Sequence, residues 1–421
     1  MYFRPRLAAR LVAAMTTAAL LTGCSGGGFS SGTPSDADPD QLRMLVNITP
    51  NLTKTYWQDL VQPFEEAHDV EVTIQAPSGN GVKDTLPQLL AAGNPPDVVE
   101  TLMADQVLAP EMVDLTDKDW VAKTPLAEEA ALDGKVYSVG VGMQAQSVVY
   151  YNADAFAKAE IAKPPETLDE LTAAMGKLKK AGYLPLQTAG SYVTGLQLLQ
   201  LANPSINTTH ENWHADVSAG SVTVGESMKP LLTRYADWIA KGYVDKNALG
   251  LKDADAQANF FAGKSAMYVM GSWLVRSADE AEPSFEMGAF AAPTEKGQPY
   301  PGPQGVTMAA PYMVLKDNPN VELATELVEW LVTDEQAVAS QLAQDGNFRP
   351  GTEQELSSLG QQVQGILDEA PRYVAQGEGY GSTTLPAGFN TAWNEAVQGL
   401  YIGKSPEDVA ATVDSWVQDQ K

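Results

Sequence analysis

Short apolar runs alternate along this chain with longer stretches in which apolar residues recur at helical spacing. The runs LRMLVNI (42–48) and VEVTIQA (70–76) have the length and residue types of strands, and NPPDVVETL (94–102) is typical of a buried strand. Between the first two, one helical face collects Trp57, Leu60, Val61 and Phe64. Strands and helices in alternation predict an α/β fold with mostly parallel sheets.

Capping residues mark where several of the helices begin. Thr53 is placed to cap the first helix, and Pro63 inside it should kink or shorten that helix. Further helices are predicted over residues 320–343 and 405–418. The second of these opens with Ser405 as the cap, followed by a proline and two acids at the positive end of the helix dipole.

The segment 266–273 poses a question about ligand binding. The run from Ala266 to Met270 predicts a buried strand, after which Gly271 and Ser272 turn the chain into the next element. Trp273 follows directly. Its indole is either an ordinary core group or the floor of a ligand site for which the glycine leaves space, and the pattern alone leaves both readings open.

Residues 1–23 are typical of an export signal. Three arginines precede the apolar run LVAAMTTAALL, which is too short to span a bilayer as a helix. The sequence LTGC then ends at Cys24, the single cysteine of the chain, and resembles the bacterial lipoprotein box in which that cysteine receives lipid. Residues 24–40 are rich in Gly, Ser and Asp and predict a flexible tether.

Length and charge narrow the classes of protein. A chain of 421 residues indicates two or more globular units, and 44% hydrophobic with 19% charged residues describes a folded protein. The formal net charge is −26, which repels phosphate backbones and anionic lipid headgroups. We therefore expect no nucleic-acid partner and membrane contact only through the N-terminal lipid.

Four segments carry a resemblance to known proteins. They are NPPDVVETLMAD (94–105), LDGKVYSVGVGMQAQSVVYYNADAF (132–156), FFAGKSAMYVMGSW (260–273) and MGAFAAPTEKGQPYPGPQG (287–305). Together they resemble one family, the extracellular solute-binding proteins of ABC importers, in the carbohydrate-binding, maltose-binding-protein-like branch. They occur in the family's order, and the resemblance extends from about residue 41 to the end.

The resemblance implies a type II periplasmic-binding-protein-like fold of two α/β lobes with a ligand cleft between them. The lobes are discontinuous and joined by crossing hinge strands near residues 144–149, 290–293 and 346–350. It implies an N-terminal lobe of residues 41–146 plus about 292–345, and a C-terminal lobe of 147–291 plus about 346–421. A monomer without cofactor is expected, lipid-anchored on the outer face of the cell membrane, that delivers a sugar, such as an oligosaccharide, to an ABC permease.

A sugar site needs short polar side chains and an aromatic platform. By the resemblance, Trp273 is the platform and Gly271 and Ser272 shape it. The other expected ligand contacts are Asn51 and Asn80 in loops after strands, Thr101 and Asp105 where a strand turns into a helix, Gln144 or Gln146 at the first crossing, Arg349 at the third, and Phe389 with Asn390 as a looser second aromatic contact. At Gln144 and Gln146, family members often carry a carboxylate.

Some motifs point to other functions. HENWH (210–214) matches the zinc-peptidase pattern, but it lies in an Asn- and Thr-rich stretch and no third ligand follows it. GFSSG (28–32) fits the nucleophile motif but lies in the tether with no strand before it, and GKS (263–265) lacks the earlier glycine of a phosphate-binding loop. No catalytic or metal-binding residue is therefore predicted. Two alternatives stay open. One is an exported zinc metallopeptidase through HENWH (210–214), and the other is a glycoside hydrolase with paired carboxylates, because a chain with 53 acids always offers a pair.

Overall fold

The computed structural model describes residues 40–49, 51–78, 81–382 and 384–420. The predicted signal peptide, most of the tether, Cys24 and Asn80 lie outside these ranges. Within them, the chain forms two lobes with separate hydrophobic cores, plus a third, small sheet that joins them. None of the helices in the described ranges combines the length and the apolar character needed to cross a bilayer.

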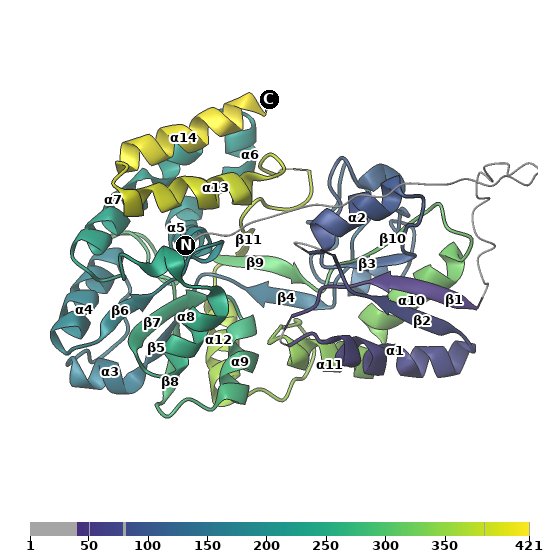
Figure 1. Ribbon diagram of the computed structural model, residues 1–421, viewed down its shortest axis with the longest axis horizontal. Helices are drawn as coiled ribbons and strands as arrows, with labels where there is room; N and C mark the ends of the chain where they lie inside the picture. Colours follow the sequence, from purple (N-terminus) through teal and green to yellow (C-terminus); the bar gives the residue numbers. More distant parts are fainter. Residues whose placement is uncertain (1–39, 50, 79–80, 383, 421) are drawn as a thin grey trace, which may run out of the picture. The chain divides into compact units, whose positions relative to one another are not determined.

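The N-terminal lobe is built on a four-stranded sheet in the order β10-β3-β1-β2 (Figure 1). β1 pairs in parallel with both β2 and β3, while β10 runs antiparallel to β3. The strands are β1 (Gln41–Leu45), β2 (Glu71–Gln75), β3 (Val98–Glu100) and β10 (Tyr312–Val314). The helices are α1 (Lys54–His68), α2 (Val82–Ala91), α10 (Val321–Thr333) and α11 (Glu335–Gln344).

Helix α1 follows the sequence pattern closely. Thr53 accepts a hydrogen bond from the backbone N–H of Tyr56, and the apolar face of Trp57, Leu60, Val61 and Phe64 is buried. Pro63 does not shorten this helix, which runs for 15 residues to His68. The predicted single helix over 320–343 is divided, because the side chain of Asp334 accepts from the N–H groups of Gln336 and Ala337 and so begins α11.

The C-terminal lobe has a second four-stranded sheet in the order β6-β7-β5-β8. Its strands are β5 (Val148–Asn152), β6 (Leu184–Gln187), β7 (Ser265–Met270) and β8 (Met287–Ala291). β6 and β7 are parallel, but β5 runs antiparallel to β7 and β8, so the expectation of mostly parallel sheets is wrong here. All six residues of β7 are buried, as its apolar run predicts.

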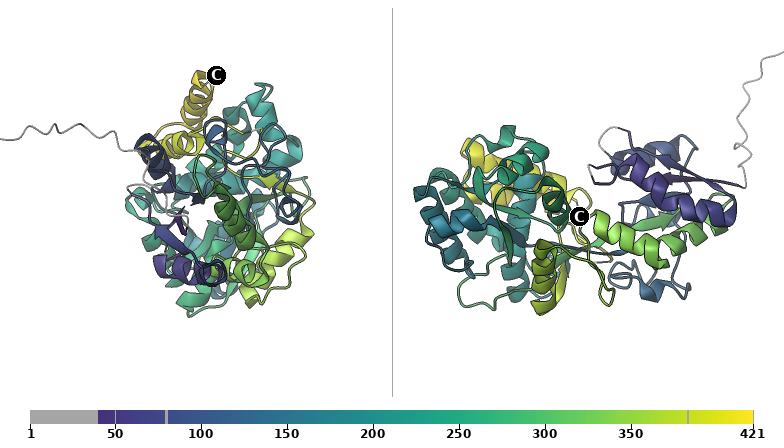
Figure 2. Two further views of the ribbon diagram at one scale, coloured as in Figure 1. Left: turned by 90° about the vertical axis from the view of Figure 1, so that its right-hand side faces the viewer. Right: turned by 90° about the horizontal axis from the view of Figure 1, so that it is seen from below.

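Helices cover this second sheet, and α13 packs on α5 while α14 packs on α7 (Figure 1). Figure 2 shows the last helices of the chain, in yellow, on this lobe from two further sides. The helices of this lobe are α3 (Ala153–Lys158), α4 (Leu168–Lys180), α5 (Val193–Thr209), α6 (Trp213–Ser218), α7 (Val224–Ala240), α8 (Asp253–Phe261), α9 (Trp273–Ala281), α12 (Ser358–Glu369), α13 (Phe389–Gln398) and α14 (Pro406–Asp419). The capping box of Ser405 and Asp408 opens α14, which confirms the predicted start of that helix.

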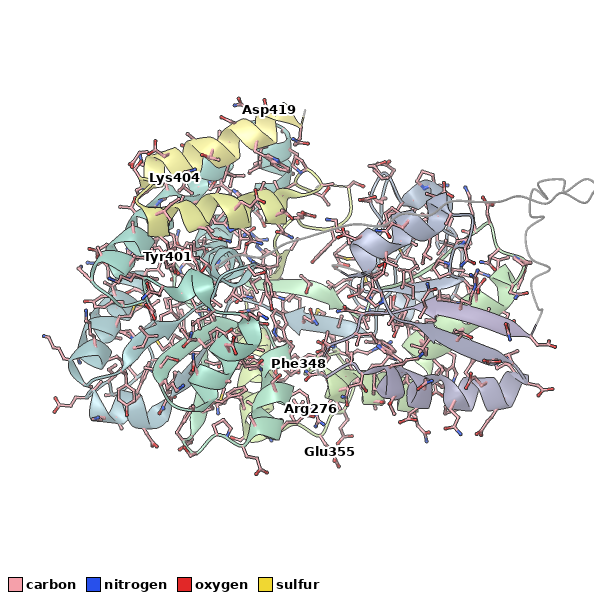
Figure 3. The ribbon with its side chains drawn as sticks, in the orientation of Figure 1. Arg276, Phe348, Glu355, Tyr401, Lys404 and Asp419 are labelled. Carbon is pink, nitrogen blue, oxygen red and sulfur yellow. The ribbon has the colours of Figure 1, made fainter. Side chains whose placement is uncertain are left out.

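A three-stranded sheet, β11-β9-β4, joins the two lobes. It consists of β4 (Gly142–Ala145), β9 (Gln304–Ala309) and β11 (Tyr373–Ala375). The chain leaves β4 for β5 through Ser147, which has a φ of 58°, and leaves β9 for β10 through Ala310, which has a φ of 42°. Phe348 pairs with Met143 at the third connection, between α11 and α12 (Figure 3).

The second crossing lies later in the chain than residues 290–293. Thr294 forms a bridge with Thr167, and the N–H of Glu295 donates to the hydroxyl of Ser205 at 2.9 Å, so this segment packs on the C-terminal lobe. The chain joins the N-terminal sheet only at β10, after β9 has paired with β4. The predicted boundary at about 292 is corrected to the end of β9.

Candidate functional site

A cleft of about 520 Å³ is lined by residues of both lobes and of the joining sheet. One wall comes from the loop after β1, the start of α1 and the end of β3. The opposite wall comes from α8, the end of β7 and the start of α9. Its polar and aromatic lining includes Asn47, Asn51, Tyr56, Trp57, Glu100, Thr101, Gln144, Tyr192, Asp253, Gln257, Trp273, Ser277, Thr307, Asp345 and Asn347.

Trp273 lines this cleft and lies against the backbone of Gly271. A Cβ atom added to Gly271 would come within 2.1 Å of Cζ3 of the indole, so only glycine leaves room for the ring in this position. Ser272 is fully buried, and its hydroxyl accepts from the N–H of Ala145 at 3.1 Å. Gly271 and Ser272 therefore position the platform and fasten the end of β7 to β4, without lining the cleft themselves.

The N-terminal wall is fixed by backbone contacts. The N–H of Asn47 donates to Oε2 of Glu100 at 2.8 Å, and the indole N–H of Trp57 donates to the carbonyl of Asn47 at 2.9 Å. Thr101 has a φ of 80°, and its N–H donates to the carbonyl of Pro311 at 2.9 Å. A β-branched residue with positive φ is strained, and such strain concentrates at functional sites.

At the first crossing, Gln144 lines the cleft and Gln146 does not. Nε2 of Gln144 donates to Oδ2 of Asp345 at 2.9 Å, and its Oε1 accepts from the hydroxyl of Thr307 at 3.3 Å. Gln146 is 3% exposed and accepts from Nε2 of Gln200 at 2.5 Å. Gln146 therefore belongs to the polar packing between the joining sheet and α5.

Two carboxyl groups of the cleft have pKa values above the ordinary range. Burial raises the pKa of Glu100 to about 8, against the opposing effect of the bond from the N–H of Asn47. Burial also raises the pKa of Asp345, although the side chains of Asn51, Gln144 and Asn347 hydrogen-bond to it and lower that pKa. Both acids lie near Tyr56. Burial raises the pKa of the Tyr56 hydroxyl, so this side chain is neutral at pH 7.

On the C-terminal wall, Asp253 begins α8 and holds two tyrosines in place. Its Oδ2 accepts from the hydroxyl of Tyr192 at 2.5 Å, and its Oδ1 accepts from the hydroxyl of Tyr268 at 3.1 Å. Tyr192 is 40% exposed, so its ring offers a second aromatic surface on the same wall as Trp273.

Of the expected ligand contacts, Asn51, Thr101, Gln144 and Trp273 line the cleft. Asp105 lies outside the lining, and its side chain accepts from the N–H groups of Val107 and Leu108, which makes it a local turn cap. Asn80 is outside the described residues.

The second aromatic contact expected from the family resemblance, at Phe389 and Asn390, lies away from the cleft. Phe389 is fully buried in the core of the C-terminal lobe, where its ring stacks on Trp393 with centroids 6.3 Å apart. Asn390 is exposed on α13, and its N–H donates to the carboxylate of Glu378. Neither residue lines the cleft, so both are removed from the candidate site.

Arg349 does not line the cleft, and its side chain contacts the backbone of the N-terminal lobe. Its guanidinium donates to the carbonyls of Val141, Val332 and Lys123 at 3.2, 2.8 and 2.6 Å. These carbonyls come from the approach to β4, from α10 and from the short helix at 121–123. The side chain therefore ties the third crossing to the N-terminal lobe.

Sequence reasoning missed Glu100, Tyr192, Asp253 and Asp345. Glu100 lies at the end of the predicted strand in NPPDVVETLMAD, and Asp345 directly precedes the third crossing. Strand ends and crossings border the cleft in the predicted fold, so these two positions could have indicated cleft residues. Asp253, at the start of a helix, reads as a capping acid.

The HENWH motif does not form one helical face. α5 ends at Thr209, His210 is its C-cap, and α6 begins only at Trp213, so the two histidines lie on different elements. His214 is buried, its Nε2 lies 3.0 Å from the carbonyl of Gly377, and burial lowers its pKa. No group of three or more potential ligands for a metal ion occurs among the described residues.

Comparison with known proteins gives consistent matches. The family model described as bacterial extracellular solute-binding protein matches residues 49–338. The multiple sugar-binding protein of Streptococcus mutans serotype c is 28% identical over 179 residues, which are 41% of this chain and 42% of that protein.

Among solved structures, a chitin oligosaccharide binding protein has a TM-score of 0.76 at 22% identity, over 90% of this chain and 98% of its own. A sugar transporter of Bacillus licheniformis in complex with stachyose has a TM-score of 0.73 at 20% identity, over 90% of this chain and 100% of its own. These likenesses confirm the predicted two-lobe fold of the type II class.

Proposed function

The chain belongs to the bacterial extracellular solute-binding proteins. We propose that it captures a sugar, of the oligosaccharide class, in the cleft between its lobes and delivers it to the permease of an ABC importer. The observation that carries this proposal is the placement of Trp273. Its indole lies on Gly271 at the edge of a cleft that also presents the amides of Asn51 and Gln144.

The chemistry of the cleft suits a sugar. A pyranose ring has an apolar face of C–H groups, which packs on an indole, and a rim of hydroxyls that both donate and accept. Amides, hydroxyls and carboxylates surround the aromatic groups of this cleft, and together they match both features. The proteins of similar fold that bind a chitin oligosaccharide and stachyose support an oligosaccharide as the ligand class.

The first test is a thermal-shift screen of residues 41–421 against mono- and oligosaccharides, followed by calorimetry on the best ligand. A ligand present at 100 times its dissociation constant should stabilise the folded chain by about 2.7 kcal/mol. The sugar should be recovered intact after long incubation. Stabilisation by amino acids or peptides in place of sugars would contradict the proposal, and cleavage of the sugar would favour the glycoside hydrolase alternative.

We further propose that Cys24 carries the lipid that holds the protein on the outer face of the membrane, on the basis of the LTGC sequence and the tether composition that follows it. Stable anchoring by lipid requires more than one acyl chain.

Cys24→Ala removes the residue that would receive the lipid. The protein should then move from the membrane fraction to unprocessed precursor or to the medium. An unchanged distribution in cell fractionation would reject the anchor.

A further inference from the structure

The charged residues that line the cleft are all acids. Glu100 comes from the N-terminal wall, Asp253 from the C-terminal wall and Asp345 from the end of α11, next to the joining sheet. Among the described lining residues, none is Lys, Arg or His. None of the ion pairs in the described part of the chain includes any of these three carboxylates.

One corner of the cleft holds three acceptors, since Asp345 lies close enough to Glu100 to raise its pKa and hydrogen-bonds to the side chain of Asn347. Glu100 is 2% exposed and accepts from the N–H of Asn47, and Asp345 accepts from Gln144. Asn347 is also 2% exposed and lines the cleft, and its Oδ1 has no hydrogen-bond partner among the described residues. A buried acceptor without a donor is costly, so this corner is suited to a ligand group that donates hydrogen bonds.

Charge decides which donor fits best. A sugar hydroxyl donates one hydrogen bond but brings no positive charge, so Glu100, whose pKa burial raises to about 8, stays protonated beside it at pH 7. An ammonium group donates three hydrogen bonds and also supplies the opposite charge, and charge-assisted bonds are stronger than neutral ones. A carboxylate or sulfate on the ligand would add a like charge to the cleft and should be repelled.

We propose that the cleft selects a sugar bearing an ammonium group, an amino sugar, over its neutral counterpart, and that it rejects anionic sugars; this inference rests on the proposed sugar-binding function. Glu100, Asp345 and Oδ1 of Asn347 receive the ammonium group. Asp253 lies on the opposite wall, and both of its oxygens already accept from tyrosines. It therefore contributes negative charge to the cleft and no direct hydrogen bond to the ammonium group.

The test is calorimetry with a matched pair of probes, the tetramer of N-acetylglucosamine and its de-N-acetylated counterpart, with stachyose as a second neutral sugar. We expect the de-N-acetylated tetramer to bind at least roughly tenfold more tightly at pH 7 and low salt, and high salt to reduce this advantage. Equal or tighter binding of the neutral sugars would overturn the inference while leaving sugar binding intact. Absence of binding by every sugar in the wider screen would instead contradict the proposed function.

Variants of the acceptor corner locate the effect. Glu100→Gln keeps an acceptor for the N–H of Asn47 but removes the charge, so the affinity ratio of the two tetramers should fall severalfold, and Asp345→Asn should act in the same direction. Glu329→Gln is the matched control, because Glu329 is exposed on α10, lies outside the cleft lining and carries the same charge. A ratio that changes equally in the control would attribute the preference to net charge and would contradict the inference.

A pH profile gives an independent readout. The charged group that faces Glu100 is Asp345, and the tyrosines near it, Tyr56 and Tyr312, are neutral because burial raises the pKa of each. Since the pKa of Glu100 is about 8, it must lose its proton to pair with the ammonium group. Binding then releases one proton from Glu100, so the affinity ratio should rise with pH below the pKa of the amino groups of the probe and level off above it. A ratio independent of pH throughout in wild type would exclude Glu100 as the partner.

Discussion

Trp273→Ala should weaken binding of the best sugar by tenfold to a hundredfold and leave the stability of the ligand-free protein nearly unchanged. The indole is only partly buried and lines the cleft. Loss of its burial against a sugar ring should cost roughly 1.5–3 kcal/mol of binding free energy. Calorimetry measures the affinity, and thermal unfolding without ligand measures the stability.

Gly271→Ala provides a control for the position of the indole. Its new Cβ would overlap the ring, so the indole must move and affinity should fall as in Trp273→Ala. The double variant should then lose little more than either single variant, because both changes remove the same contact. A large drop in the melting temperature of Trp273→Ala with affinity intact would instead make this tryptophan a core residue.

Phe389→Ala should produce the opposite result. The ring is fully buried and packs in the core of the C-terminal lobe, so its truncation leaves a cavity and should lower the free energy of unfolding by about 3–5 kcal/mol. Sugar affinity, measured at a temperature where the variant is folded, should stay within about threefold of wild type, because Phe389 lies outside the cleft lining.

Asn390→Ala is the matched control for that result. Asn390 is the exposed neighbour of Phe389 on α13, and exposed substitutions of this kind usually change stability by less than about 0.5 kcal/mol. A loss of affinity in folded Phe389→Ala, with its stability close to that of wild type, would return this residue to the ligand site.

The sequence predicts local structure well where the physical cause is local. The apolar face of α1, the buried run of β7 and the capping box of α14 all follow from neighbouring residues, and all three are observed. The split at Asp334 was missed because the apolar pattern continues on both sides of a side chain that caps the second helix. The position of the second crossing depends on the pairing of β9 with β4, two strands far apart in the chain.

The site was predicted only in part, because sequence position does not determine where a side chain points. Gln144 and Gln146 would share a face on a continuous strand, but β4 ends at Ala145 and Ser147 turns the chain, so only Gln144 reaches the cleft. Arg349 lies at a predicted crossing, yet its guanidinium donates to three backbone carbonyls of the N-terminal lobe. Glu100 and Asp345 come together only through the tertiary fold.

The most direct test of the central claim, that the cleft between the lobes is the sugar site, is a crystal structure with the best ligand from the thermal-shift screen. We expect a sugar ring stacked on the indole of Trp273, with its hydroxyl or ammonium groups within hydrogen-bond distance of Gln144 and of Glu100 or Asp345. A sugar bound with full occupancy elsewhere, such as in the groove lined by Thr391 and Glu395 of α13 and Trp416 of α14, with the cleft free of ligand, would contradict the account.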